Sequence, residues 1–461
     1  MKTRKKLYSE SKDQQPKSRK ESRDKAKVIA TPKKVAAQKD NPNEMNVALA
    51  ADVKDAAVER RALELLGSPN FFGKLLAAVA RMGAVGEQIN ALVVFIVCVS
   101  RLLPKPLCLF VKGSSSSGKN YVTDTVLSLF PESERHNLTS ASLRSWNYMQ
   151  DELAHKIVYV AERNESVGHI HPTRLLISEQ KLVHWVTVKR DGQFVREKRE
   201  TRGPIAAIST TTRDTVQVDD ETRHISIWID ESPEQTARIV KAALMEGPGL
   251  DENELKTWHE VQRLLQKRAE LSIEFPSWFA TVSQFVRNDD VRVRRYFPAF
   301  LQACKVVALI RSFRSEEKKL SEQGKITIKF SDFASAALIF NRIFEQSLDS
   351  TKQEEIQTQE AVRRISSQNN GDPVSASDLA KELNVSPDKA YRMLRDAASS
   401  ETIVRANDST QTNLKLYLPS TKCAFLPDPE ELFQKLRDSL PERVRFIHPL
   451  TGATVEYRRE D

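Results

Sequence analysis

The sequence has few cysteines and no long apolar run, and each shortage excludes a class of protein. Only Cys98, Cys108, Cys304 and Cys423 are present, and no two of them form a C-x-x-C pair. A zinc knuckle or disulfide framework is therefore not expected, and a reducing cytoplasm fits the composition. The longest uncharged stretch, Gln88–Ser100, is shorter than the roughly 20 residues of a membrane-spanning helix.

Charge is distributed unevenly along the 461 residues. Residues 1–44 hold 14 Lys and Arg against 6 Asp and Glu, which leaves 57 against 56 in the remainder. No apolar run follows the basic start, so the sequence predicts no secretory signal and a cytoplasmic protein. Residues 1–45 are predicted to be a disordered basic tail. The tail serves either as a solubilising segment or as a non-specific nucleic-acid arm.

Apolar periodicity divides the rest of the chain. Residues 46–105 predict a module of three helices, and strand-like runs alternate with helices over 106–240, which is typical of a parallel α/β sheet. Residues 241–350 are mostly helical. Residues 373–420 predict a helix-turn-helix, capped by Ser377, and then two strands. Residues 421–461 form a C-terminal extension without a predicted role.

The sharpest motif is a glycine- and serine-rich loop between a strand-like run and a helix. Such loops place glycines where the backbone approaches phosphates and point N–H groups inward at a helix N-terminus. A lysine then reaches the outer phosphates. The alternative is a flexible linker with a chance lysine. The predicted nucleotide contacts are Gly113, Ser114, Ser115, Ser116, Ser117, Gly118, Lys119 and Asn120.

Two positions depart from the usual pattern of such sites. Asn120 stands where a Ser or Thr hydroxyl usually binds Mg²⁺, and its amide oxygen can hold a hard cation with altered geometry. The apolar strand from His155 ends at Ala161-Glu162, where an Asp-Glu pair is usual. Glu162 is predicted to orient the attacking water or to reach the metal through water. A surface glutamate at a strand end is the alternative.

Two further residues follow apolar strands. The apolar strand Ile205–Thr212 ends in hydroxyl residues, where a sensor of the γ-phosphate would sit, and Thr210 or Thr211 is predicted to be that sensor, with simple capping of the strand as an equal alternative. Arg223 follows an acidic segment and could act on a neighbouring subunit's γ-phosphate as an arginine finger. The alternative for Arg223 is an ion pair with its acidic neighbours.

Two basic segments are candidate DNA contacts. Asp191-Gly192 between β-branched runs predicts a hairpin, and Lys189, Arg190 and Arg196 on its arms are predicted to contact DNA phosphates. A solvated hairpin is the alternative. In the second helix of the helix-turn-helix, a shared face suits recognition of DNA, or a protein-interaction domain. That face carries Lys389, Arg392 and Arg395.

Taken in order, these motifs resemble a family of bacterial and mobile-element AAA+ ATPases, similar to minichromosome-maintenance (MCM) helicases and often fused to a zinc-finger primase. The resemblance covers roughly residues 60–345, and the cysteine-bearing primase segment is missing here. It is carried by the lead-in Phe71–Arg101, the loop Gly113–Lys119, and the segments Asp151–Glu162, Gly203–Thr212, Glu221–Arg223, Asp230–Thr236 and Val291–Phe313.

The resemblance implies a ring-forming, hexameric motor that uses ATP and Mg²⁺ to translocate on DNA during replication of a phage, plasmid or integrative element. It implies an AAA+ core over 106–240 and a helical lid over 241–350, while the helix-turn-helix and the two strands after it predict a winged helix over 373–420 from the residues themselves. Arg223 would act across the subunit interface, Arg294 or Arg295 would be a second sensor of the nucleotide, and the hairpin would line the pore.

Other readings stay open from the residues. The chief one is a nucleotide-switched, DNA-binding initiator or loader protein with little ATP turnover, because Asn120 and Ala161 depart from the motor pattern. A small-molecule kinase is a weaker reading, which the helix-turn-helix argues against. A separate primase or other replication protein is an expected partner of the motor.

Overall fold

The computed structural model describes residues 55–138, 153–161, 167–214, 216–245, 249–314, 324–348, 353–369, 371–399, 403–406, 415–419 and 425–459. The chain divides into two compact units, Met1–Asp52 and Val53–Asp461, and everything described belongs to the second. The basic tail and Glu162 lie outside the described residues. Within the described ranges, no helix combines the length and the apolar character that a membrane crossing requires.

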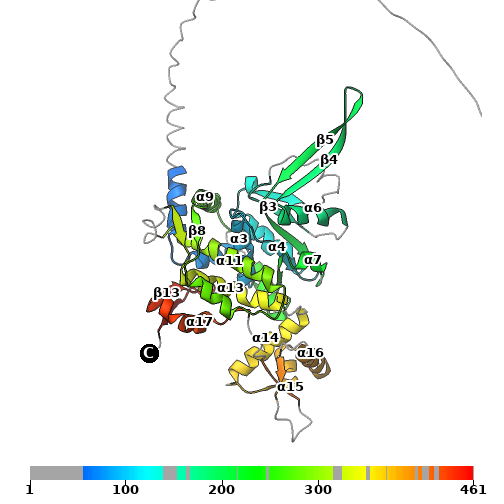
Figure 1. The fold of residues 1–461 in the computed structure, drawn as a ribbon. Coiled ribbons are helices and arrows are strands. Elements are labelled where there is room, and N and C mark those ends of the chain that lie inside the picture. The colour runs from blue at the N-terminus through cyan, green and yellow to red at the C-terminus, as the bar shows by residue number, and fades with distance from the viewer. Residues whose placement is uncertain are drawn as a thin grey trace, which may run out of the picture. The chain divides into compact units, whose positions relative to one another are not determined.

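A five-stranded sheet organises the fold (Figure 1), and all of its pairings are parallel. The central strands β1 and β6 are buried throughout, as parallel strands covered on both faces are. The result is a mixed α/β fold compatible with the predicted P-loop class. In spatial order the strands are β2 (Arg135–Leu138), β3 (Lys156–Val160), β6 (Ile205–Thr211), β1 (Leu109–Lys112) and β7 (Ile225–Trp228).

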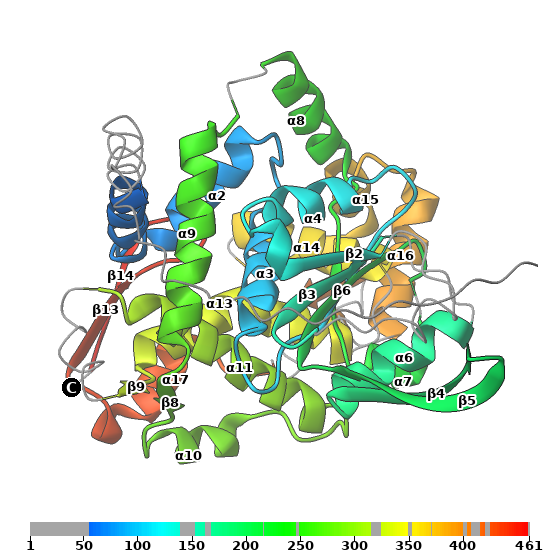
Figure 2. The ribbon, with the colours of Figure 1, turned by 90° about the horizontal axis from the view of Figure 1, so that it is seen from above.

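Several helices lie in the N-terminal part of the chain, and two of them, α3 and α6, contact β6 of this sheet. The first spans residues 55–66, and the others are α2 (Phe71–Arg81), α3 (Gln88–Ser100), α4 (Lys119–Leu127), α6 (Val167–Ser178), α7 (Val218–Glu221) and α8 (Pro233–Leu244). Residues 91–100 of α3 are all buried, which marks a core helix rather than a surface one. Figure 2 shows α3 beside α4, and the two helices contact each other.

The next part of the chain is helical, as predicted. It comprises α9 (Glu252–Arg268), α10 (Phe279–Val282), α11 (Val293–Arg311) and α13 (Phe330–Leu348), with a short parallel pair of β8 (Ser272–Glu274) and β9 (Lys325–Thr327). A buried ion pair between Arg311 and Asp332, 2.7 Å long, joins α11 to α13. Both helices also contact α3, so one hydrophobic core spans the sheet and this helical part.

A second hydrophobic core lies in residues 353–419. Its elements are α14 (Gln353–Gln368), α15 (Ala376–Glu382), α16 (Pro387–Ser399) and an antiparallel sheet in the order β10 (Val374–Ser375), β12 (Leu416–Pro419), β11 (Ile403–Arg405). The predicted cap Ser377 is wrong. Ser375 caps α15, because its hydroxyl accepts the Asp378 N–H and the Asp378 carboxylate accepts the Ser375 N–H.

The C-terminal segment returns to the main core. It holds α17 (Pro429–Lys435) and a hairpin of β13 (Arg443–Ile447) and β14 (Thr454–Arg458). The rings of Phe433 and Tyr457 lie 5.5 and 6.4 Å from that of Phe330 on α13. Residues 425–459, which had no predicted role, therefore help to complete the core around α13.

The predicted hairpin is confirmed by β4 (Lys181–Arg190) and β5 (Gln193–Arg202), which pair in antiparallel register along their whole length. Asp191 and Gly192 at its turn have φ of 50° and 83°. Two successive positive φ values characterise the tight turn that Asp-Gly favours. In Figures 1 and 2 the hairpin extends outward beyond β3 and α6.

Candidate functional site

The glycine- and serine-rich loop lies between β1 and α4, at the edge where the parallel strands end. Gly118 caps α4 with a φ of 92°, and a Cβ built there would meet nothing within 4 Å. An anion that binds to the backbone N–H groups of a helix N-terminus needs open space next to them. The left-handed Gly118 leaves such a space. Lys119 is buried, and its ammonium group donates to the Ser114 carbonyl, back across the loop.

Two polar side-chain atoms, one in this loop and one in the first turn of α4, are buried without a hydrogen-bond partner among the described residues. They are Asn120 Oδ1 and Ser117 Oγ. Burying such an atom without a hydrogen bond costs about 1–3 kcal/mol. A bound ligand that interacts with the atom offsets this cost. The amide oxygen of Asn120 is a hard ligand suited to Mg²⁺. The donor set therefore fits a phosphate with a bound divalent cation.

A carboxylate that the sequence reasoning missed holds the start of the loop. Glu231, just past β7, accepts a hydrogen bond from the Ser114 N–H. A Cβ on Gly113 would stand 3.0 Å from the same carboxylate oxygen and 2.7 Å from Ser117 Oγ. Gly113 is thus required by close approach, because any side chain would displace Glu231 or Ser117.

Thr211 lies beside the loop, as predicted from its place in the sequence. It pairs in register with Lys112, the last residue of β1, and it is buried. Its hydroxyl oxygen accepts a hydrogen bond from the Arg213 N–H, 3.2 Å away. This hydrogen bond caps the end of β6. Thr211 therefore lies where a sensor of the γ-phosphate is expected, but its hydroxyl group bonds to the turn that follows the strand.

A partly buried ion pair under the loop was not predicted. Lys112 Nζ lies 2.5 Å from the Glu221 carboxylate and donates to the Asp214 carbonyl at 2.8 Å, with its side chain only 2% exposed. Ser226 donates its hydroxyl to the same carboxylate at 2.7 Å. Burial lowers the pKa of Lys112, and the charge of Glu221 opposes that shift. The Lys112 ammonium also lies 4.9 Å from the centroid of the Trp228 ring.

The structure brings two predicted arginines to one segment. Arg223 follows α7, donates to Ser178 Oγ at 3.1 Å and also donates to the Asp219 carbonyl. Arg295 on α11 donates to the hydroxyl of Thr222, the residue before Arg223. Both arginines therefore meet at the segment after α7, and Arg295 donates its hydrogen bond there rather than in the loop.

The acidic neighbours of Arg223 are engaged elsewhere. Asp220 pairs with Arg174 on α6, and Glu221 pairs with Lys112. Asp219 lies 4.0 Å from Arg174. Within the described residues, the contacts of Arg223 are thus hydrogen bonds rather than the ion pair that was the alternative for it.

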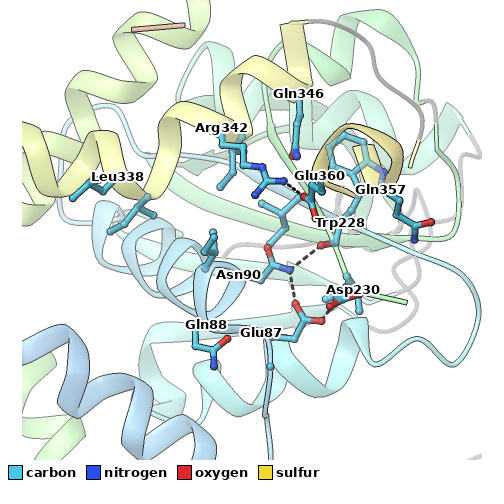
Figure 3. Close-up of a pocket in the computed structure, with 16 residues that line it drawn as sticks. Glu87, Gln88, Asn90, Trp228, Asp230, Leu338, Arg342, Gln346, Gln357 and Glu360 are labelled. Atoms are coloured by element: carbon cyan, nitrogen blue, oxygen red, sulfur yellow. Dashed lines mark hydrogen bonds and ion pairs between the residues drawn. The ribbon is translucent and has the colours of Figure 1, made fainter. Parts of the chain in front are cut away.

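A cavity of about 420 Å³ lies between the start of α3, the end of β7 and the helices α13 and α14 (Figure 3), and its lining includes Asp230 but no residue of the loop Gly113–Lys119. The Glu87 carboxylate points into it and accepts from Asn90 Nδ2 at 2.6 Å and from the Asp230 N–H at 3.0 Å. Burial raises the pKa of Glu87 to about 7, with the Asp230 charge adding to the rise and both hydrogen bonds opposing it. Across the cavity, Arg342 of α13 and Glu360 of α14 form an ion pair.

The predicted basic contacts are exposed, but they do not all share one surface. Lys389, Arg392 and Arg395 are exposed on α16, opposite its buried residues. In the hairpin, the register puts Lys189 and Arg196 on one face and Arg190 on the other, where Arg190 pairs with Glu197 at 3.4 Å. Arg190 is therefore separated from the other two predicted DNA contacts.

Comparison with known proteins finds little. No protein-family model and no curated protein matches the chain. Among solved structures, it is similar to one named SCCmec type IV Cch, an active helicase, with 13% sequence identity and a TM-score of 0.29. The match covers 72% of this chain and 66% of that one. A TM-score this low carries no argument about function, so the MCM-like family remains a prediction.

Proposed function

We propose that the chain is an ATP-dependent motor that moves on DNA, with its nucleotide bound at the loop Gly113–Lys119. The observation that carries the proposal is the pair of buried, unpartnered oxygens, Asn120 Oδ1 and Ser117 Oγ, in a loop that follows a buried parallel strand and in the first turn of the helix after it. A linker would leave these atoms in water.

Each residue of the loop has a distinct task in this proposal. Lys119 neutralises the outer phosphates, and the N–H groups at the start of α4 hold the phosphates through their dipoles. Asn120 would hold Mg²⁺ through its amide oxygen. Mg²⁺ would supply charge neutralisation on the phosphate oxygens that it contacts. Glu162 orients the attacking water, and Thr211 reports the terminal phosphate.

The arginines would complete the site of a neighbouring subunit. Arg223 and Arg295 meet at the segment after α7, so a ring of copies would present both to one adjacent nucleotide. An arginine that acts on the γ-phosphate stabilises charge as the transition state forms. This arrangement predicts a hexameric ring in which hydrolysis requires assembly.

The remaining parts supply the DNA contacts. Residues 353–419 have the order of helices and strands of a winged helix, with the basic face of α16 exposed as a recognition helix. The β4–β5 hairpin would line the pore, and α9, α11 and α13 would form the lid. We further propose that the motor serves replication of a phage, plasmid or integrative element, together with a separate primase.

A second function is favoured by one observation. Asn120 replaces the hydroxyl residue that usually binds Mg²⁺, and Ala161 replaces the usual aspartate before Glu162. Both changes weaken metal binding, so a nucleotide-switched initiator or loader that assembles with ATP but hydrolyses it poorly is the alternative. The two functions share the binding site and differ in turnover.

Equilibrium binding of Mg²⁺–ATP tests the site that both functions share. Lys119→Ala should reduce the affinity at least tenfold, because the loop N–H groups alone leave the outer phosphates underneutralised. Lys256→Ala, which removes an exposed lysine of α9, is the matched control and should bind as the wild type does. Equal affinity in Lys119→Ala and the wild type would refute the assignment of the loop.

A further inference from the structure

The β4–β5 hairpin has one face that is wholly exposed. Directly opposed residues of antiparallel strands share a face, so the pairs Trp185–Lys198 and Lys189–Phe194 define one side of the hairpin. We call this side the aromatic face. It consists of Lys181, Val183, Trp185, Thr187, Lys189, Phe194, Arg196, Lys198, Glu200 and Arg202, and all ten residues are exposed.

Two large rings stand in water on the aromatic face. Trp185 is 60% exposed and Phe194 is 77% exposed, although burial of such rings is strongly favourable. Phe194 is level with Lys189, four residues from Trp185, so the two rings are separated along the strand by about 14 Å at roughly 3.4 Å per residue. This spacing lets one extended polymer contact both rings at different units.

The charge around these rings is positive. The guanidinium of Arg196 lies 5.7 Å from the centroid of the Trp185 ring, and Lys189 is directly opposite Phe194. In the part of the chain that the structure describes, neither Lys189 nor Arg196 has an acidic partner. The one acidic residue of the face, Glu200, lies farther from the turn and pairs with Lys198 at 3.5 Å and Arg202 at 2.9 Å.

The opposite face of the hairpin differs from the aromatic face in both burial and charge. Leu182 and Val186 are buried there. Arg190 is paired with Glu197, so its charge is partly neutralised. The hairpin thus packs by one face and leaves the aromatic face to a ligand that is both anionic and able to stack.

We propose that the aromatic face binds single-stranded nucleic acid by stacking bases on Trp185 and Phe194, while Lys189 and Arg196 contact the adjoining phosphates. Every base has a π face, so such stacking tolerates any sequence. In a duplex the bases are already stacked on one another, so the face selects single strands. The inference rests on the proposed function only for the presence of DNA at the hairpin, and it adds base contact to phosphate contact.

The test measures binding of the full chain to an oligonucleotide of mixed sequence and to an abasic oligonucleotide of equal length. Each stacked base contributes about 5- to 150-fold in affinity, so the wild type should prefer the strand that carries bases. Trp185→Ala/Phe194→Ala should lose this preference while its salt dependence stays that of the wild type. Trp185→Phe/Phe194→Tyr, which retains both rings, should keep it.

Two control variants test the contribution of the basic side chains and that of the opposite face of the hairpin. Lys189→Gln/Arg196→Gln should keep the preference for bases but lower the salt slope by about 0.7 for each lost phosphate contact. Val195→Ala removes an exposed apolar side chain from the opposite face and should leave both quantities unchanged.

Three results would overturn the proposal. One is a base preference that persists in Trp185→Ala/Phe194→Ala, and another is a ratio of single-strand to duplex affinity that is the same in that variant as in the wild type. The third is loss of self-association in that variant with unchanged affinity for single strands, which would assign the face to a second copy of the chain. ATP affinity is measured in parallel. A wild type without ATP binding refutes the proposed function, while the base preference still decides the role of the aromatic face.

Discussion

Lys112, the last residue of β1, is buried and forms an ion pair, 2.5 Å long, with the half-buried Glu221, the last residue of α7. The loop that we assign to the nucleotide begins at the residue after Lys112, and Arg223 lies two residues after Glu221. The pair therefore connects the segment that would hold phosphates to the segment that would act on a neighbouring subunit.

Replacing either residue of this ion pair should lower the free energy of unfolding. Glu221→Gln leaves the Lys112 ammonium buried without its counter-charge, and Lys112→Met leaves Glu221 with Ser226 and the Val216 N–H as its remaining hydrogen-bond partners among the described residues. Loss of one partner of a buried pair costs about 3–5 kcal/mol, and Lys112→Met should lie at or below the low end because Glu221 is 24% exposed. Chemical denaturation measures both changes.

The double variant is the control for this prediction. Lys112→Met/Glu221→Gln should recover at least 1 kcal/mol relative to the sum of the single changes, because it leaves no unpaired charge. Strict additivity would contradict a direct interaction between the two side chains.

The stability of the fold should depend on the protonation of Glu87. Its pKa in the folded chain is about 7 against an ordinary value of 4.5, so the folded chain holds more protons than the unfolded chain between these values. The stabilisation is full below about pH 4.5 and is lost as the pH rises through 7, with a total of about 3 kcal/mol.

Denaturation of Glu87→Gln at several pH values checks this dependence. The variant should lose the decline in stability between pH 4.5 and 7 and be more stable than the wild type above pH 7. Glu234→Gln, which changes an exposed residue of α8, should follow the wild type. An unchanged pH dependence in Glu87→Gln would show that another group is responsible.

The sequence predicted the local elements well and the distant contacts poorly. The loop between β1 and α4 and the Asp191-Gly192 turn are encoded by adjacent residues with special backbone requirements. The contact of Lys112 with Glu221 joins residues 109 positions apart, and that of Arg295 with Thr222 joins residues 73 apart. Lys112 directly follows apolar residues of a strand, and this position indicates a buried partner of opposite charge. Which residue is that partner depends on the order of the strands in the sheet.

The C-terminal segment shows the same limit. Phe433 and Tyr457 pack on Phe330, yet no local pattern distinguishes them from aromatic residues of a small separate domain. In the hairpin, the sequence predicts which side chains share a face, because side chains alternate along a strand. Which of the two faces is exposed depends on how β4 packs on α6. For that reason Arg190 was grouped with Lys189 and Arg196.

Asn120 should limit the rate of hydrolysis rather than nucleotide affinity. Its amide can ligate Mg²⁺, but with a geometry different from that of a hydroxyl. We expect Asn120→Thr to raise ATP turnover several-fold with little change in ATP affinity. A slower or unchanged rate would show that the cation is held by other groups. Asn120→Ala serves as the control and should weaken Mg²⁺-dependent binding.

Arg223 should matter for turnover only in assemblies. Arginine fingers contribute on the order of 10³–10⁵ in rate in other nucleotide hydrolases, so Arg223→Ala should bind ATP nearly normally and lose most of its hydrolysis. Mixing Arg223→Ala with Glu162→Gln should restore some turnover, since some interfaces then combine an intact Glu162 with an intact Arg223. A purely structural arginine predicts lower thermal stability and no rescue on mixing.

The most direct test of the motor is steady-state ATP turnover with and without single-stranded DNA, in the wild type and in Lys119→Ala. We predict turnover that rises when single-stranded DNA is added to the wild type and that falls to background in Lys119→Ala under both conditions. Wild-type turnover equal to that of Lys119→Ala, with or without DNA, would contradict the motor. If ATP still binds, that result would leave the nucleotide-switched initiator as the function.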